Sequence, residues 1–232
     1  MAEKLTPEKI EEIAKNFEKI QEGKLPIIKG EKETVTEKID PKILQAKKEE
    51  KRILPLIPPS APRLLMQVAP FIDDTLKEFD FKDRVELSKV MYDTMVKYGG
   101  IGLSANQVGL PYRMFIMGGH PSIENGKIRS VFNPLINDVS KETVSMKEGC
   151  LSFPFLFLSI TRPKWCSVKY TDQHGKEIEE TLHGMNARIF QHENEHMNGY
   201  VFTDLVSKFK LERAKESRKK MLKKYARGGA IG

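Results

Sequence analysis

The hexapeptide QHENEH, residues 191–196, is the stretch that decides how this chain folds and what it holds. Residues four apart lie one turn apart on the same face of a helix, so His192 and His196 can hold one cation. Glu193 follows next round the helix and can reach a water on that cation, where a carboxylate acts as general base. Two histidines are too few for a metal ion, so a third ligand must come from elsewhere in the chain.

The best third ligand lies in the pentapeptide EGCLS, residues 148–152. Cys150 offers a thiolate, which suits divalent transition metals. One cysteine and two histidines leave a fourth position open for water, which is the pattern of a catalytic rather than a structural site. A Cys150–Cys166 disulfide is the competing interpretation, but it would consume the third ligand. The combination indicates metal-assisted hydrolysis.

Three separated blocks of this chain resemble the signature motifs of peptide deformylases. They are GIGLSANQ at residues 100–107, EGCLS at 148–152 and QHENEH at 191–196. An HExxH pattern alone also occurs in unrelated zinc peptidases, but all three blocks in this order form a specific combination. The resemblance covers residues 52–206 and leaves both ends of the chain outside.

The resemblance implies a metal-dependent enzyme that removes the formyl group from the N-terminal formyl-methionine of new polypeptides and releases formate. Glu193 would be the base, and the donors to the developing oxyanion would be the Gln107 side chain and the backbone N–H of Leu151. The implied ion is Fe²⁺ in the cell, with Zn²⁺, Ni²⁺ or Co²⁺ possible in a purified sample. A zinc endopeptidase and a non-catalytic ribosome-binding protein with a deformylase-like domain are the alternative functions.

Further positions match the family's substrate-binding and bracing residues. The glycines would let the substrate backbone approach, and the apolar residues would line the methionine pocket, although Met146 could equally be an ordinary core residue. Glu148 and Arg162 resemble an acidic–basic pair that braces the cysteine loop, with a surface ion pair of little worth as the alternative. The candidate substrate-binding residues are Ile101, Gly102, Met146, Gly149, Met185 and Ile189.

The chain departs from the family pattern at a few positions. Ser104 stands where alanine is more usual, which we interpret as a small-for-small change. Glu195 replaces aspartate and, about 200° round the helix from Glu193, should point away from the metal. The apolar run at residues 153–158 is interpreted as a rim of the peptide groove.

Hydrophobic periodicity predicts an α+β fold in which short antiparallel or mixed sheets pack around the metal-binding helix. We expect an N-terminal amphipathic helix plus charged linker at residues 1–51, the catalytic domain at 52–206 and a basic helical tail at 207–232. Helices are predicted near residues 83–98 and 185–197. Strands are predicted near residues 113–117, 130–133, 165–171 and 176–182, and the family's opening strand and loop near 54–65.

The two ends of the chain differ in character. The N-terminal helix has one apolar stripe and is interpreted as a packing element or a dimer contact. Residues 207–232 hold ten Lys or Arg and two Glu, so the net charge of +7 belongs to this tail. A basic helix here would dock on ribosomal RNA, as the resemblance implies for some deformylases, and a solvated, frayed terminus is the alternative.

Composition indicates a compartment as well. No run of about 18 apolar residues exists, and the tail's apolar stripe is thin, so we expect no membrane insertion. The Glu-rich start lacks the apolar core of a signal peptide and the arginines of a transit peptide. Two cysteines, one in a metal motif, favour a reducing compartment. We therefore expect a cytoplasmic protein.

Overall fold

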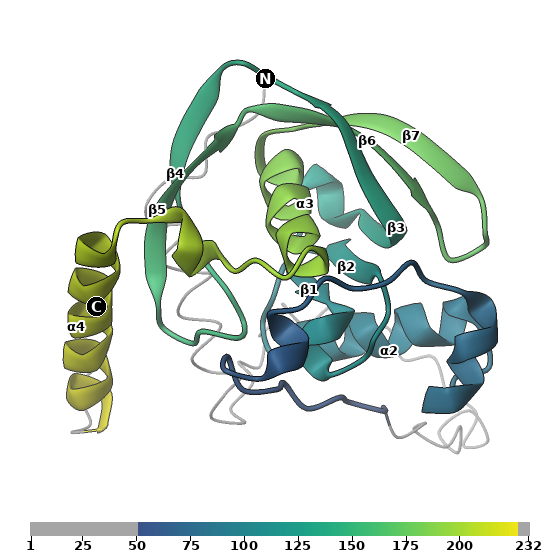
Figure 1. Ribbon diagram of the computed structural model, residues 1–232, viewed down its shortest axis with the longest axis horizontal. Helices are drawn as coiled ribbons and strands as arrows, with labels where there is room; N and C mark the ends of the chain where they lie inside the picture. Colours follow the sequence, from purple (N-terminus) through teal and green to yellow (C-terminus); the bar gives the residue numbers. More distant parts are fainter. Residues whose placement is uncertain (1–50, 227–232) are drawn as a thin grey trace, which may run out of the picture.

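The computed structural model describes residues 51–226, which form an α+β fold around one central helix (Figure 1). A five-stranded antiparallel sheet has the order β1-β2-β3-β6-β7, and a separate hairpin pairs β4 with β5. The predicted N-terminal helix and most of the linker lie outside the described residues. The strands are β1 Gly102–Ser104, β2 Met114–Gly118, β3 Ile128–Val139, β4 Thr143–Gly149, β5 Phe157–Pro163, β6 Trp165–Thr171 and β7 Glu177–His183.

Three α-helices flank these strands among the described residues: α2 Arg84–Lys97, α3 Gly184–Met197 and α4 Lys208–Ala226. Short 3₁₀ turns connect them, and no helix in this part of the chain is long and apolar enough to cross a membrane. The 3₁₀ turns are η1 Pro62–Leu64, η2 Asp73–Phe79, η3 Ala105–Val108, η4 Glu124–Gly126 and η5 Phe202–Leu205.

Strand β2 shows why the sheet has a core on each face. All five of its residues are buried, and successive side chains point to opposite faces. Met114 and Ile116 join the cluster that contains α2, while Phe115 and Met117 join the cluster that contains α3. The sheet therefore holds α3 from one side only, and the other side of α3 faces the β4–β5 hairpin (Figure 1).

Helix boundaries agree closely with the prediction. Asp83 is the N-cap of α2, where its side chain accepts a hydrogen bond from the backbone N–H of Glu86 at 2.8 Å. Helix α3 begins one residue before the predicted start and ends at the predicted Met197. The tail is helical over Lys208–Ala226, where a basic helix was predicted, and the rest of the predicted tail lies outside the described residues.

Two predictions about strands were wrong or incomplete. The opening strand near residues 54–65 is absent, because Pro55, Pro58 and Pro59 cannot donate to a ladder, and the segment instead forms a turn at 59–60 followed by η1. The β4–β5 hairpin was not predicted. Five of the seven β4 residues are exposed, so the short alternation of polar and apolar residues at 143–147 does not mark a buried face.

Candidate metal centre

The structure brings the three predicted ligands together. Cys150 directly follows β4, and His192 and His196 lie one turn apart on α3. Their ligand atoms all lie within 4.8 Å of one another, and Sγ of Cys150 is 3.3 Å from Nε2 of His196. Both cysteines are free, so the disulfide alternative is wrong, and Cys166 is a fully buried core residue.

Glu193 lies beside this cluster in a dry environment. It is 4 % exposed, burial raises its pKa to about 7, and its Oε2 has no hydrogen-bond partner among the described residues. Gly102 of β1 allows this placement, because a Cβ built there would lie 2.4 Å from Oε1 of Glu193. A glycine at 102 is therefore needed for the carboxylate to reach the site.

Gln107 turns its amide nitrogen toward the cysteine loop. Its Oε1 accepts hydrogen bonds from the backbone N–H and the hydroxyl of Ser104, each at 2.9 Å. Its Nε2 lies 3.0 Å from Oγ of Ser152 and 3.5 Å from Sγ of Cys150. Leu151, whose backbone N–H is the other predicted donor, is buried next to Cys150. The predicted donors thus flank the ligand cluster.

Glu148 and Arg162 form a buried pair rather than a surface one. The guanidinium donates to both carboxylate oxygens at 2.7 and 3.0 Å, and both side chains are nearly inaccessible to solvent. Nδ1 of His192 lies 3.1 Å from the same carboxylate. Burial alone would raise the pKa of Glu148, but hydrogen bonds from His192 and Arg162 lower it to about 2. An ionised Glu148 fixes the His192 ring so that Nε2 is left to ligate.

Two members of this network were not predicted. Arg188, one turn before His192, donates to Glu148 at 2.6 Å and to the carbonyl oxygens of Ile160 and Val144 at 2.9 and 2.7 Å. Glu195 accepts from Nη2 of Arg162 at 2.9 Å and is not part of the ligand cluster. The position of Arg188, one turn before a predicted ligand on the same helix face, could have suggested its role. Its partners could not be identified, because they lie on the β4–β5 hairpin, which was not predicted.

The candidate substrate-binding residues fall into two groups. Ile101, Met185 and Ile189 belong to one apolar cluster between the sheet and α3, and Ile189 also lies against Gly102. Met146 lies on β4 opposite Ile160 and is not part of that cluster.

The hairpin side of the site differs from the predicted rim. Gly149 lies under the ring of Phe157, whose Cε1 would be 2.8 Å from a Cβ at residue 149. Leu156 and Leu158 are buried in a separate cluster with α4. The run at 153–158 therefore does not form one exposed rim of a groove, because its leucines face the C-terminal helix.

A buried set of one thiol and two imidazoles, with an unpartnered carboxylate oxygen and an oriented amide donor beside it, defines the class of metal-dependent hydrolases. The donor set fits a divalent transition metal, because thiolate and imidazole are the ligands that such ions prefer. Burial lowers the pKa of His196, whereas hydrogen bonds with Cys150 and Glu148 outweigh burial and raise the pKa of His192. A histidine ligates in its neutral form, so metal binding here would release a proton from His192.

Comparison with known proteins places the chain within this class. A model of the polypeptide deformylase family matches residues 62–212. The chain is 44% identical over 117 residues to a peptide deformylase of Thermotoga maritima, covering 50% of this chain and 68% of that relative. It is 38% identical over 159 residues to a peptide deformylase of Maricaulis maris, covering 68% of this chain and 87% of that relative.

Solved structures agree with these relatives. The crystal structure of the Thermotoga maritima peptide deformylase superposes with a TM-score of 0.58 at 36% identity, covering 67% of this chain and 98% of that one. The Ehrlichia chaffeensis peptide deformylase in complex with actinonin has a TM-score of 0.61 at 36% identity, covering 72% and 96%. The chain belongs to the peptide deformylase family and is an enzyme. Neither the endopeptidase nor the non-catalytic alternative finds support among these relatives.

Proposed function

We propose how the family's reaction, removal of the formyl group from the N-terminus of a new polypeptide, is divided among the residues of this chain. Cys150, His192 and His196 would hold the metal ion, which when bound supplies a Lewis acid and a nucleophilic water at neutral pH. The convergence of these three ligand atoms within 4.8 Å is the observation that carries the proposal.

Proton transfer falls to Glu193. Its carboxylate is buried beside the ligands, and a pKa raised to about 7 lets it both accept a proton and return it near neutral pH. It would take the proton of the attacking water and pass it to the amine that leaves. Gly102 keeps this path open, because any side chain there would collide with the carboxylate.

Stabilisation of the developing oxyanion falls to two donors. Nε2 of Gln107 faces the cysteine loop, and the backbone N–H of Leu151 belongs to that loop. A donor that is already oriented needs no rearrangement as charge develops on the formyl oxygen. Ser104 orients the Gln107 amide by holding its oxygen.

The substrate would lie along β1 and the hairpin. Its main chain would run beside Ile101, Gly102 and Gly149, and its methionine side chain would enter the apolar cluster of Ile101, Met185 and Ile189. Met146 would border the pocket from β4.

The donor set suits divalent transition metals in general, and the family resemblance supports one of them. We propose Fe²⁺ in the cell, with Zn²⁺, Ni²⁺ or Co²⁺ as occupants of a purified sample. The test is formate release from a formyl-Met peptide before chelation, after chelation and after each metal is added back. Chelation should abolish release, and one of these ions should restore it. Full activity in the chelated, metal-free protein would contradict the proposal.

We propose further that the protein works in the cytoplasm and meets its substrate at the ribosome. Two free cysteines, one of them a predicted ligand, suit a reducing compartment. The outward face of α4 carries exposed lysines, including Lys208, Lys210, Lys219 and Lys220, which suit contacts to RNA phosphates. The segment at residues 1–51 is proposed as a separate extension that could mediate a dimer.

A further inference from the structure

The loop after Cys150 adopts a conformation that needs outside support. Two successive turns are closed by hydrogen bonds from Phe153 N to Cys150 O at 2.9 Å and from Leu156 N to Phe153 O at 3.1 Å. Within the second turn, Phe155 has a φ of +63°, in the left-handed region that non-glycine residues rarely adopt. Such a residue persists where surrounding structure imposes its conformation. Contacts from outside the loop should therefore hold it.

One of these contacts is aromatic and leads to the ligand helix. The ring of Phe153 meets the ring of Phe202 edge-on, with centroids 5.6 Å apart. The same Phe202 ring lies 5.8 Å from the imidazole of His192. Phe202 is 1 % exposed, so one buried phenyl ring links the cysteine loop to a ligand of the other element.

Helix α4 supplies the second set of contacts, as its place beside β5 in Figure 1 suggests. Leu211 and Ala214 pack against the cluster that contains Leu156 and Phe202. Arg218 follows on the same face, one turn after Ala214, and its Nε donates to the carbonyl oxygen of Pro154 at 2.7 Å. The hydrogen bond thus ends on the residue directly before Phe155.

We propose that α4 supports the metal site, with Arg218 as a positioning residue for the loop that carries Cys150 and the Leu151 N–H. Arg218 fixes the Pro154 carbonyl at the strained point of the loop, while Leu211 and Phe202 hold the loop's apolar side chains. The inference rests on Cys150 as a metal ligand. It does not rest on the proposed ribosome docking, for which we have named exposed lysines of α4 and not Leu211, Ala214 or Arg218.

A helix whose only role was to bind the ribosome would not need a second face packed against the protein. Leu211, Ala214 and Arg218 are each partly buried, whereas the neighbouring Lys210 and Lys215 are exposed. The guanidinium of Arg218 donates to a backbone carbonyl 64 residues away in sequence, in the loop of a predicted ligand. The two faces of α4 therefore have separate roles, one toward the loop and one toward solvent.

The experiment compares full-length variants loaded with Ni²⁺. For Arg218→Gln we expect the rate of metal loss to excess chelator to rise about threefold to tenfold, at or below the usual range for residues that orient ligands. With the metal removed from both proteins, amide hydrogen exchange at Phe153 and Leu156 should also be faster in Arg218→Gln than in the unaltered protein. A shorter variant that ends at Ser207 keeps Phe202 but loses Leu211, Ala214 and Arg218 together, and should raise both rates at least as much.

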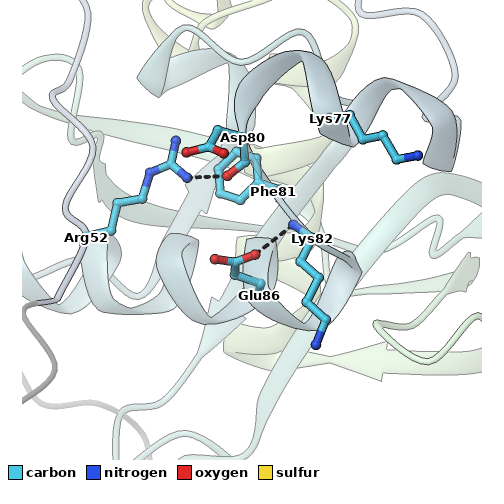
Figure 2. A pocket seen from close by; sticks show the side chains of 6 residues that line it. All are labelled: Arg52, Lys77, Asp80, Phe81, Lys82 and Glu86. Atoms are coloured by element: carbon cyan, nitrogen blue, oxygen red, sulfur yellow. Dashed lines mark hydrogen bonds between the residues drawn. The ribbon is translucent and has the colours of Figure 1, made fainter.

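Arg52→Gln is the matched control. Arg52 also donates to backbone carbonyl oxygens of a distant segment, those of Asp80 at 2.7 Å and Phe79 at 3.0 Å. Figure 2 shows it in a pocket of about 530 Å³ that none of the predicted site residues lines. This variant loses the same charge and the same kind of hydrogen bond, so its metal loss should match the unaltered protein.

Two outcomes would overturn the proposal. One is metal loss from Arg218→Gln at the rate of Arg52→Gln, with unchanged exchange in the loop. The other is exchange that rises in α2 as much as in the loop, since that would mean global destabilisation rather than release of one segment.

Discussion

The hydroxyl of Ser104 donates a hydrogen bond to Oε1 of Gln107 at 2.9 Å, inside a site where both side chains are at most 1 % exposed. The backbone N–H of Ser104 donates to the same oxygen. An amide whose oxygen has two donors must present its nitrogen in the opposite direction, toward Cys150 and Ser152. The change from alanine to serine at 104 is therefore more than the small-for-small exchange inferred from sequence.

Ser104→Ala should lower kcat about threefold to tenfold while KM changes little. The variant keeps the backbone donor and loses the hydroxyl's hydrogen bond to Gln107, which is worth about 0.5–1.5 kcal/mol, together with the hydroxyl's interaction with Glu193, which lowers the pKa of that carboxyl. Formate release from a formyl-Met peptide measures both constants. Ser88→Ala is the control, because Ser88 is also buried but its hydroxyl has no partner among the described residues. If both variants turn over like the unaltered enzyme, the Ser104 hydroxyl does not orient Gln107.

Glu193 and His196 should respond differently to removal. Glu193→Ala should keep the metal and lose activity by about 10²–10⁴-fold, because it removes a proton carrier and no ligand. His196→Ala should lose metal and activity together. Metal content by mass spectrometry, set beside formate release, separates the two roles. A Glu193→Ala protein that binds no metal would show that the carboxylate is a ligand instead of the base.

Glu180 on β7 should make stability depend on pH. Burial opposes its ionisation, but hydrogen bonds from Arg129 and Tyr170 outweigh burial and hold its pKa below the ordinary value. A depressed pKa means that the folded state favours the carboxylate. The resulting stability is complete above the unfolded pKa of about 4.3 and is lost as pH falls through the folded pKa.

Glu180→Gln should therefore lower the free energy of unfolding at pH 7 by about 1–2 kcal/mol, and the difference should shrink below about pH 4. Urea unfolding at pH 7, 5 and 3.5 measures it. Glu177→Gln is the control, because the Glu177–Lys169 pair is exposed and should contribute little. A Glu180→Gln deficit that stays constant down to pH 3.5 would mean that charge is not its cause.

The candidate metal ligands could be predicted from the sequence more fully than the residues that hold and orient the site. His192 and His196 could be paired because helical periodicity is local, and Cys150 could be added because a thiolate suits a divalent transition metal. Arg188 could not be paired, because its partners lie on β4 and β5, at least 28 residues away in sequence, and only the folded hairpin brings them to α3. The Ser104–Gln107 contact depends on the 3₁₀ turn η3, which no periodic pattern marks. Predictions failed where a residue's role depends on contacts with segments distant in the sequence, which the spacing of residues along the chain does not show.

The outward face of α4 should bind ribosomes through charge. Replacing Lys208, Lys210, Lys219 and Lys220 with glutamine should abolish co-sedimentation with ribosomes at low salt, because each lysine lost removes about one phosphate contact. Variants with fewer replacements should show a salt slope reduced by about one for each lysine removed.

The control for this prediction removes four lysines that lie away from α4: Lys77, Lys82, Lys97 and Lys141, all exposed. It changes the net charge equally, so a general attraction between a basic protein and RNA would weaken to the same extent in both variants. Co-sedimentation that survives in the control and disappears in the α4 variant assigns the contact to this helix, because the two variants have the same net charge and differ only in where it is lost. Equal loss in the two variants would contradict a specific docking face on α4 and leave its inner face, toward the cysteine loop, as the helix's one role.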